Sequence, residues 1–362
     1  MPAAHTTSHF NDSPLTGRII ALDLTKVLAA FFVAFEHLHF HFHPAGVRLS
    51  AICALPMSFF ESMSGVFFVI AGYFATRDGQ WKKAWTNAFW CAVVFLVWNS
   101  LFVVCSGIRA QDFSLHHFAD LYGVGAWILP QWKLEGCHTV NPANYPLWFM
   151  RDLIFLFLLA PIIKRYARPI FLLLFIASLT PYFRTVLAGG TGTVLSPFTS
   201  VAFFAAGAFL RSLPQETQDG ILRFYSPKLI ILYLLIFSIN IALGSLYPDI
   251  RGVLTQKSFA TSLFAIWIFY QIARWIEVRI PLATPATKRL VPVIFLVFAG
   301  HAVIYTFCLP NLLLNSLPMA LAAPFLIFAL MLLLFAAMKK WCPYLLRPVA
   351  YYKIRSKSTH QA

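Results

Sequence analysis

Charged residues are scarce in this sequence. Asp, Glu, Lys and Arg make up 11% of the 362 residues, whereas a soluble domain averages about 25%. Hydrophobic residues make up 59%, and the mean hydropathy is +0.72. The apolar residues form blocks of about 18 to 25 rather than amphipathic stripes or alternating segments of about 10 residues. The sequence therefore excludes an ordinary soluble domain and a β-barrel, and it predicts an all-α, polytopic membrane protein.

The six cysteines form no CxxC pair, so the sequence gives no support to a redox or metal site built on cysteine. Cys105 and Cys137 lie at the two ends of a predicted external loop, which leaves open either a disulfide or two free thiols. His39, His41 and His43 alternate, but no carboxylate or cysteine accompanies them. We therefore expect no metal ion.

Acidic residues are also few, which gives the chain a formal net charge of +15. The basic residues lie in short clusters between apolar blocks, a pattern typical of membrane orientation and not of a nucleic-acid groove. We expect no nucleic-acid partner.

Residues 1–17 lack the apolar core of a signal peptide, so we expect the first apolar block to be a retained helix. About ten transmembrane helices are predicted in all. Their approximate ranges are 19–40, 57–75, 84–106, 147–164, 168–183, 198–212, 228–247, 258–275, 291–309 and 317–338.

The connections on one side of these spans, called the basic side below, hold 20 Lys and Arg, whereas those on the other side hold six. By the positive-inside rule the basic side is cytoplasmic, which places both termini in the cytoplasm. We expect the chain in the inner (plasma) membrane. Residues 1–18 are then a polar segment, 19–338 a single domain and 339–362 a basic tail. An external loop at 107–146 is long enough to cover a substrate, although its Trp and Tyr also suit an interfacial cap.

The first apolar block carries Asp23, Lys26, Glu36 and His37. Lys26 and His37 are eleven residues apart, so on a helix they face the same way about 16 Å apart along the axis. Ionisable side chains avoid lipid, so this stripe is expected to line a protein interior or a wet cavity. A simple end of the helix at His37 is the alternative.

Three other groups stand out in later blocks. Arg151 and Asp152 lie near the outer end of the fourth block, where Asp152 suits either a functional role or the first turn of the helix. A buried Arg151 needs an anionic or hydrogen-bonding partner. His301 falls near the middle of the bilayer, where an ionisable group is most often functional. Gly65 and Gly72 share one helix face and predict close helix packing.

Four blocks of the sequence resemble a known family. Lys26, ten intervening residues and His37 resemble the first-helix signature of the acyltransferase-3 membrane O-acyltransferases. Residues 65–73 (GVFFVIAGY) are similar to the family's second-helix pattern, residues 146–153 (PLWFMRDL) to its LWF block, and residues 295–301 (FLVFAGH) to its late block. The order and spacing match over nearly the whole chain. The form of residues 148–152 is similar to the branch containing the enterobacterial common antigen O-acetyltransferase.

The chain also departs from the family pattern at four positions. Lys26 stands where arginine is most common, and Ala71 stands where the second-helix motif has serine. Leu153 takes the place of a frequent glutamate, and Phe298 takes the place of a tyrosine. These departures bear on which molecule accepts the acyl group that enzymes of this family transfer.

The resemblance implies transfer of an acyl group, usually acetyl from cytoplasmic acetyl-CoA, to a hydroxyl of an envelope carbohydrate. His37 would then be the base, since its pKa lies near neutrality, or it would itself accept the acyl group. His301 is expected to be a second catalytic or acceptor-binding group. Glu36 or Asp152 would orient a histidine or bind sugar hydroxyls.

Binding roles follow from the same resemblance. Lys26 and Arg77 would hold the CoA phosphates, and Arg151, Asp152 and Trp148 would bind the acceptor. The expected partners are acyl-CoA, an envelope glycan or lipid-linked sugar, and membrane lipids, with acetyl-CoA as donor and no metal.

Two other classes of function stay open. Ionisable residues at several membrane depths also suit a proton-coupled transporter of a sugar or organic acid, or a glycolipid flippase, although the two halves of the chain show no inverted repeat. A non-catalytic partner in envelope assembly would tolerate replacement of His37.

Overall fold

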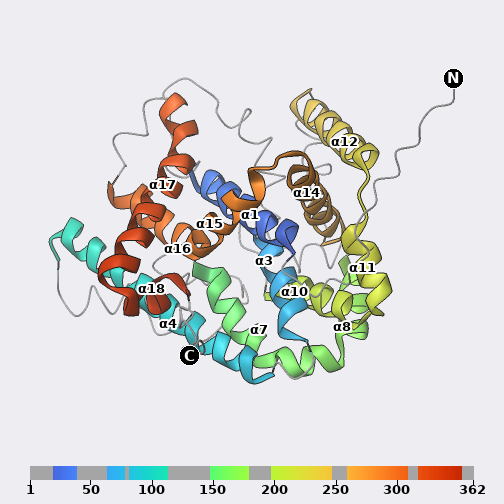
Figure 1. Ribbon diagram of the computed structural model, residues 1–362, viewed down its shortest axis with the longest axis horizontal. Coiled ribbons are helices and arrows are strands. Elements are labelled where there is room, and N and C mark those ends of the chain that lie inside the picture. The colour runs from blue at the N-terminus through green and yellow to red at the C-terminus, as the bar shows by residue number, and fades with distance from the viewer. Residues whose placement is uncertain are drawn as a thin grey trace, which may run out of the picture.

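The computed structural model describes residues 19–38, 63–77, 81–112, 147–178, 197–246, 259–308 and 317–352. Within these ranges the chain is almost wholly helical and contains no strand, which confirms the predicted all-α class (Figure 1).

Each of the ten predicted apolar ranges overlaps a helix. These helices are α1 (Ile20–Leu38), α3 (Ser64–Ala75), α4 (Trp81–Ala110), α7 (Trp148–Arg165), α8 (Ala167–Ser178), α10 (Pro197–Ser212), α12 (Pro227–Leu246), α14 (Phe259–Arg279), α16 (Ile294–Val303), which continues as the π-helix η3 (Ile304–Cys308), and α17 (Leu317–Trp341). Among the described residues, three stretches are long and apolar enough to cross a membrane: Trp81–Ala110, Ala283–Cys308 and Ala322–Trp341. The count of ten crossings and the cytoplasmic termini stay predictions.

Short helices precede or follow several of these longer helices. They are α11 (Gln215–Arg223), α15 (Ala283–Leu290), the 3₁₀ turns η2 (Val291–Val293) and η4 (Pro343–Leu345), and α18 (Leu346–Ala350). Basic residues in the last turns of α11 and α15 favour these helices, because cations there offset the partial negative charge of the exposed carbonyl groups.

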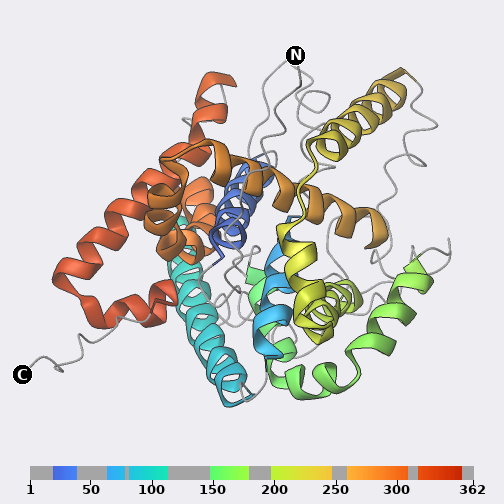
Figure 2. The same ribbon diagram turned by 45° about the vertical axis from the view of Figure 1, so that its right-hand side comes forward.

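Helix α1 lies at the centre of the molecule. It packs against α3, α14, α16 and α17, and both views show it surrounded by later parts of the chain (Figures 1 and 2). Helix α4 packs along α7 and carries α18 on its surface. Helix α1, which carries Asp23 and Lys26, is therefore surrounded by other helices.

Helices α3 and α10 make the most extensive contact between two described helices, and their backbones approach closely. A Cβ added to Gly72 would lie 2.0 Å from the carbonyl oxygen of Phe204, and one added to Gly207 would lie 1.9 Å from that of Val69. Each glycine thus lets the other backbone approach. The predicted packing role of Gly65 and Gly72 is confirmed, since a Cβ on Gly65 would also meet the Phe203 ring at 3.0 Å.

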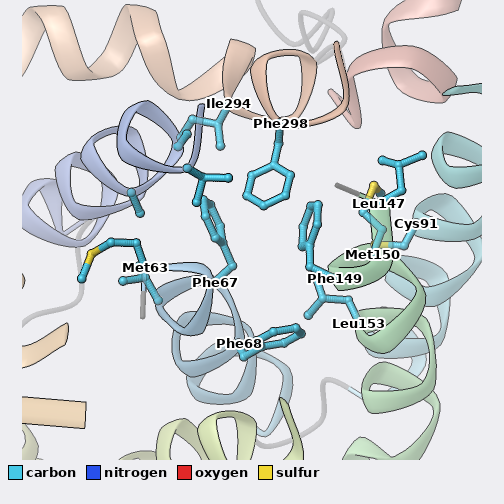
Figure 3. Packing of buried hydrophobic residues seen from close by; sticks show 14 of the residues in the cluster. Met63, Phe67, Phe68, Cys91, Leu147, Phe149, Met150, Leu153, Ile294 and Phe298 are labelled. Carbon is cyan, nitrogen blue, oxygen red and sulfur yellow. The ribbon is translucent and has the colours of Figure 1, made fainter. Parts of the chain in front are cut away.

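Three phenylalanines from three helices meet in the core. The ring of Phe298 on α16 reaches down to the rings of Phe67 on α3 and Phe149 on α7, with centroid distances of 5.2 and 3.7 Å (Figure 3). Phe67 and Phe149 are themselves 6.1 Å apart. These three residues are called the phenylalanine layer below. All three are buried.

Helix α12 is peripheral. It packs chiefly against α14, and its outward residues Ile231 and Leu235 are 66% and 55% exposed. In both views it projects from the rest of the helices (Figures 1 and 2). Exposed apolar residues of this kind suit contact with lipid.

Candidate active site

A cavity of about 210 Å³ lies among α1, α3, α4, α7 and α16, and Tyr351 adds to its wall. Most of its lining is apolar. The polar residues of the lining are Lys26, Lys83, Asn87, Cys91 and Tyr351. A mostly apolar pocket with a few polar groups is the usual form of a small-molecule site.

The exposure of residues along α4 shows which end of the cavity is open. Lys83, Asn87 and Cys91 follow one another at four-residue intervals, and they are exposed, half-buried and buried in that order. Eight residues of helix span about 12 Å. On α3 the same gradient runs from Phe74, which is 49% exposed, to the buried Phe67. The mouth therefore lies beside Lys83, near the first residues of α4.

Two lysines border the cavity. Lys26 is partly buried and forms an ion pair with Asp23 at 2.5 Å. Its predicted position on an inward stripe is consistent with its place in the lining. Lys83 was not singled out from the sequence, although its spacing from Asn87 and Cys91 indicates a shared helix face. Arg77, predicted beside Lys26 as a phosphate ligand, is exposed and is not part of the lining.

The C-terminal segment contributes to the cavity wall. The indole nitrogen of Trp98 on α4 donates a hydrogen bond to the carbonyl oxygen of Val349 at 2.9 Å, which holds α18 against α4. Tyr351 follows in a left-handed conformation with φ of 53°, hydrogen-bonds to Cys91 and packs on Phe295 with the ring centroids 4.9 Å apart. Burial raises the pKa of its hydroxyl above the ordinary value. Part of the predicted basic tail therefore belongs to the packed domain.

His301 is fully buried on α16. Its Nδ1 lies 2.9 Å from the carbonyl oxygen of Val297, which can only accept a hydrogen bond, so this contact requires the proton on Nδ1. His301 shares one face of the helix with Phe298 and Tyr305. The ring centroids of Phe298 and Tyr305 are 6.2 and 5.9 Å from that of the imidazole.

Tyr305 connects this face to α1. It lies in the π-helix η3, a rare form that is frequent at functional sites. Its hydroxyl donates a hydrogen bond to the carbonyl oxygen of Ala34 at 2.9 Å. Ala34 precedes His37 by three residues. The backbone of Glu36 and His37 forms the last turn of α1, whereas their side chains lie outside the described residues.

Arg151 and Asp152 form a buried ion pair. Nε and one terminal nitrogen of the Arg151 guanidinium donate to one carboxylate oxygen of Asp152 at 3.1 and 3.0 Å, and the Ser200 hydroxyl donates to the other oxygen at 2.7 Å. Because α7 begins at Trp148, Asp152 is beyond its first turn, which excludes the alternative of a first-turn role. The pair instead connects α7 to α10. Trp148 is buried beside Phe68, with a centroid distance of 6.0 Å.

Within the described residues, no group of three or more His, Cys, Asp or Glu side chains is placed to hold a metal ion. His39, His41, His43 and Cys137 lie outside these residues. Cys105 carries a free thiol.

Comparison with known proteins gives one family and one relative. The family described as "Acyltransferase domain" matches residues 19–340. The "Succinoglycan biosynthesis protein ExoH" of Rhizobium meliloti (strain 1021) is 31% identical over 124 residues, which cover 31% of this chain and 32% of that protein. The match thus spans about a third of the relative's length. No solved structure matches the chain.

Proposed function

This chain belongs to the acyltransferase family that matches residues 19–340, and from this premise we propose that it is a membrane O-acyltransferase. It moves an acyl group, most simply acetyl, from cytoplasmic acyl-CoA to a hydroxyl of a cell-envelope carbohydrate or glycolipid. The observation that carries the proposal is the cavity that opens beside Lys83 and contains Lys26 in its wall.

The size and charge of this cavity suit one end of acyl-CoA. At about 210 Å³ it is smaller than the ~300–1,000 Å³ of a pocket that encloses a whole drug-sized ligand. The acyl group and the end of the pantetheine arm would occupy it, with the nucleotide outside. Lys83 at the mouth and Lys26 within the wall offer positive charge to the donor phosphates.

The transfer itself needs a base near the acceptor hydroxyl. The hydroxyl oxygen attacks the thioester carbonyl, the C–S bond breaks, a histidine takes the hydroxyl proton and CoA leaves as a thiolate that is then protonated. His37 is the proposed base, with Glu36 beside it in sequence, and the buried His301 is the second candidate. An acyl-histidine at His37 is the alternative route.

The acceptor is proposed from the relative and the resemblance together. The relative's name places it in the biosynthesis of succinoglycan, and the resemblance of residues 148–152 favours an O-acetyltransferase of the enterobacterial common antigen branch. Both favour a glycan as acceptor, and we propose a glycan of the envelope. Trp148, Arg151 and Asp152 stay predicted acceptor ligands, with the qualification that Asp152 already has two hydrogen-bonding partners.

The test is acyl transfer from radiolabelled acetyl-CoA, and in parallel succinyl-CoA, to envelope glycolipid and polysaccharide fractions. Membranes with the native protein are compared with membranes holding His37→Ala or the neighbouring His39→Ala at matched expression. We expect label in one carbohydrate fraction that falls at least about 100-fold with His37→Ala and persists with His39→Ala. Equal label with every variant would refute the role of His37. No label from either donor, together with loss of a sugar gradient in His37→Ala, would favour the transporter.

A further inference from the structure

We propose that the phenylalanine layer is a partition that separates the donor cavity from His301, and that Phe298 is the residue that closes it. This inference rests on the proposed function for its enzymatic consequence. The partition itself depends only on the positions of the three phenylalanines and not on what the protein transports or transfers.

The first observation is the order of residues along α16. Val291, Ile294 and Phe295 line the cavity, Phe298 lies one turn further, and His301 lies one turn beyond Phe298. From Phe295 to His301 the helix rises about 9 Å. A group that reaches the inner end of the cavity therefore meets Phe298 before it meets the imidazole.

The second observation is the contact that Phe298 makes on both sides. Its ring packs against Phe67, which lines the inner end of the cavity, and against Phe149, one turn from the lining residue Leu153 (Figure 3). The ring of His301 is a further neighbour, at 6.2 Å between ring centroids. Phe149, Phe298 and His301 are each 2% exposed or less. The layer thus fills the space between cavity and histidine.

A closed layer at this place has a chemical use. A thioester that waits in the cavity for an acceptor is protected from water that enters from the far side, since excluding water suppresses side reactions of activated groups. Without the layer, a water oxygen attacks the thioester carbonyl, the C–S bond breaks, and the products are the free carboxylic acid and CoA. During productive transfer the Phe298 side chain must move aside.

The partition is tested without reference to enzymatic activity by thiol labelling. Ala71 lines the cavity, so Ala71→Cys is introduced into a chain whose six native cysteines are replaced by serine or alanine. Right-side-out and inside-out vesicles are treated with a small, charged methanethiosulfonate reagent. We expect labelling from the basic side alone when Phe298 is present, and from both sides when Phe298→Ala is added.

The enzymatic consequence is tested with labelled acetyl-CoA and no added acceptor. We expect Phe298→Ala to raise the release of CoA and acetate at least about five-fold and to lower transfer to the envelope fraction. The matched control is Phe203→Ala, another fully buried phenylalanine, which lies on α10 and does not line the cavity. A substitution that only destabilises the protein should lower both the release of CoA and the transfer of acetyl to the envelope fraction. Should Phe298→Ala fail to fold, Phe298→Leu gives the same shift to a smaller extent.

The outcomes separate the partition from the proposed function. Labelling of Ala71→Cys from both sides while Phe298 is present would overturn the partition. So would labelling from one side only with Phe298→Ala, combined with unchanged CoA release. The expected change in labelling together with no acyl transfer by any preparation would support the partition and refute the acyltransferase.

Discussion

The hydroxyl of Tyr305 donates a hydrogen bond to the carbonyl oxygen of Ala34 at 2.9 Å. Two helices that carry the proposed catalytic histidines are thereby joined, since Tyr305 follows His301 by one turn and Ala34 precedes His37 by one turn. This bond joins the end of α1 to η3, in addition to the packing of α1 against α16. Its removal is a direct test of whether the two histidines act at one site.

Tyr305→Phe is expected to lower the rate of acyl transfer and to leave donor binding unchanged. The variant keeps the buried ring and removes only the hydroxyl, whose hydrogen bond is worth about 0.5–1.5 kcal/mol, so transfer should fall roughly 2- to 10-fold. The measurement is kcat and KM for acetyl-CoA. A raised KM with unaltered kcat would place Tyr305 at the donor site instead.

Lys83→Met should weaken the binding of acetyl-CoA. Its ammonium lies at the cavity mouth, where it meets the donor phosphates before the thioester enters, so KM should rise several-fold, by on the order of 1 kcal/mol, with kcat retained. The matched control is Lys82→Met. Lys82 is the preceding residue and is not part of the lining; its ammonium lies over the Trp81 ring. An equal rise in KM for both variants would contradict a specific role for Lys83.

Asp152→Asn is expected to destabilise the protein more than Ser200→Ala. Loss of the carboxylate charge leaves the buried Arg151 guanidinium without its counter-charge, which costs about 3–5 kcal/mol, whereas loss of the Ser200 hydroxyl costs about 1–3 kcal/mol. Thermal unfolding of the two purified variants in one detergent measures the difference. If Asp152→Asn unfolds at the native temperature and yet lacks transfer, the carboxylate has a direct part in acceptor binding or catalysis.

Gly72→Ala should disrupt the contact of α3 with α10 and reduce the yield of folded protein. The new methyl group would lie 2.0 Å from a backbone oxygen, which no side-chain movement relieves, so the helices must separate at a cost of about 1–3 kcal/mol or more. Gly220→Ala in α11 is the control, because a Cβ there meets nothing within 4 Å, and alanine favours the helix. Size-exclusion profiles and unfolding temperatures compare the two.

The positions of the helices followed from the sequence because long apolar runs must satisfy their backbone hydrogen bonds internally. The residues at which the helices begin and end were harder to predict. Helix α4 begins at Trp81 and ends at Ala110, beyond the predicted 84–106, since charged residues such as Lys83 lower the local hydropathy without ending a helix. The amphipathic helices α11 and α15 were expected to be plain connections, because short polar helices give no long apolar run.

The candidate site was partly visible in the sequence. Lys26 could be placed on an inward stripe because a charged group inside a membrane helix avoids lipid, and it lines the cavity. Ser200 as the partner of Asp152 was not visible, since 48 residues separate them and helical spacing carries no information about a different helix. Tyr351 was not predicted as a site residue because it follows the last apolar run and was assigned to the basic tail.

The peripheral position of α12 has a consequence for how freely its sequence varies. Among the described helices it packs chiefly against α14, so few side-chain contacts constrain its sequence. The main constraint is that the helix stays apolar and long enough to cross the bilayer. Exchange of leucine, isoleucine and phenylalanine at positions such as Ile231 and Leu235 should be silent, whereas the same exchanges at Phe203 or Phe204 on α10 should not. Over evolutionary time the residues of α12 can therefore change from one apolar type to another, whereas those of α10 are constrained by their contact with α3.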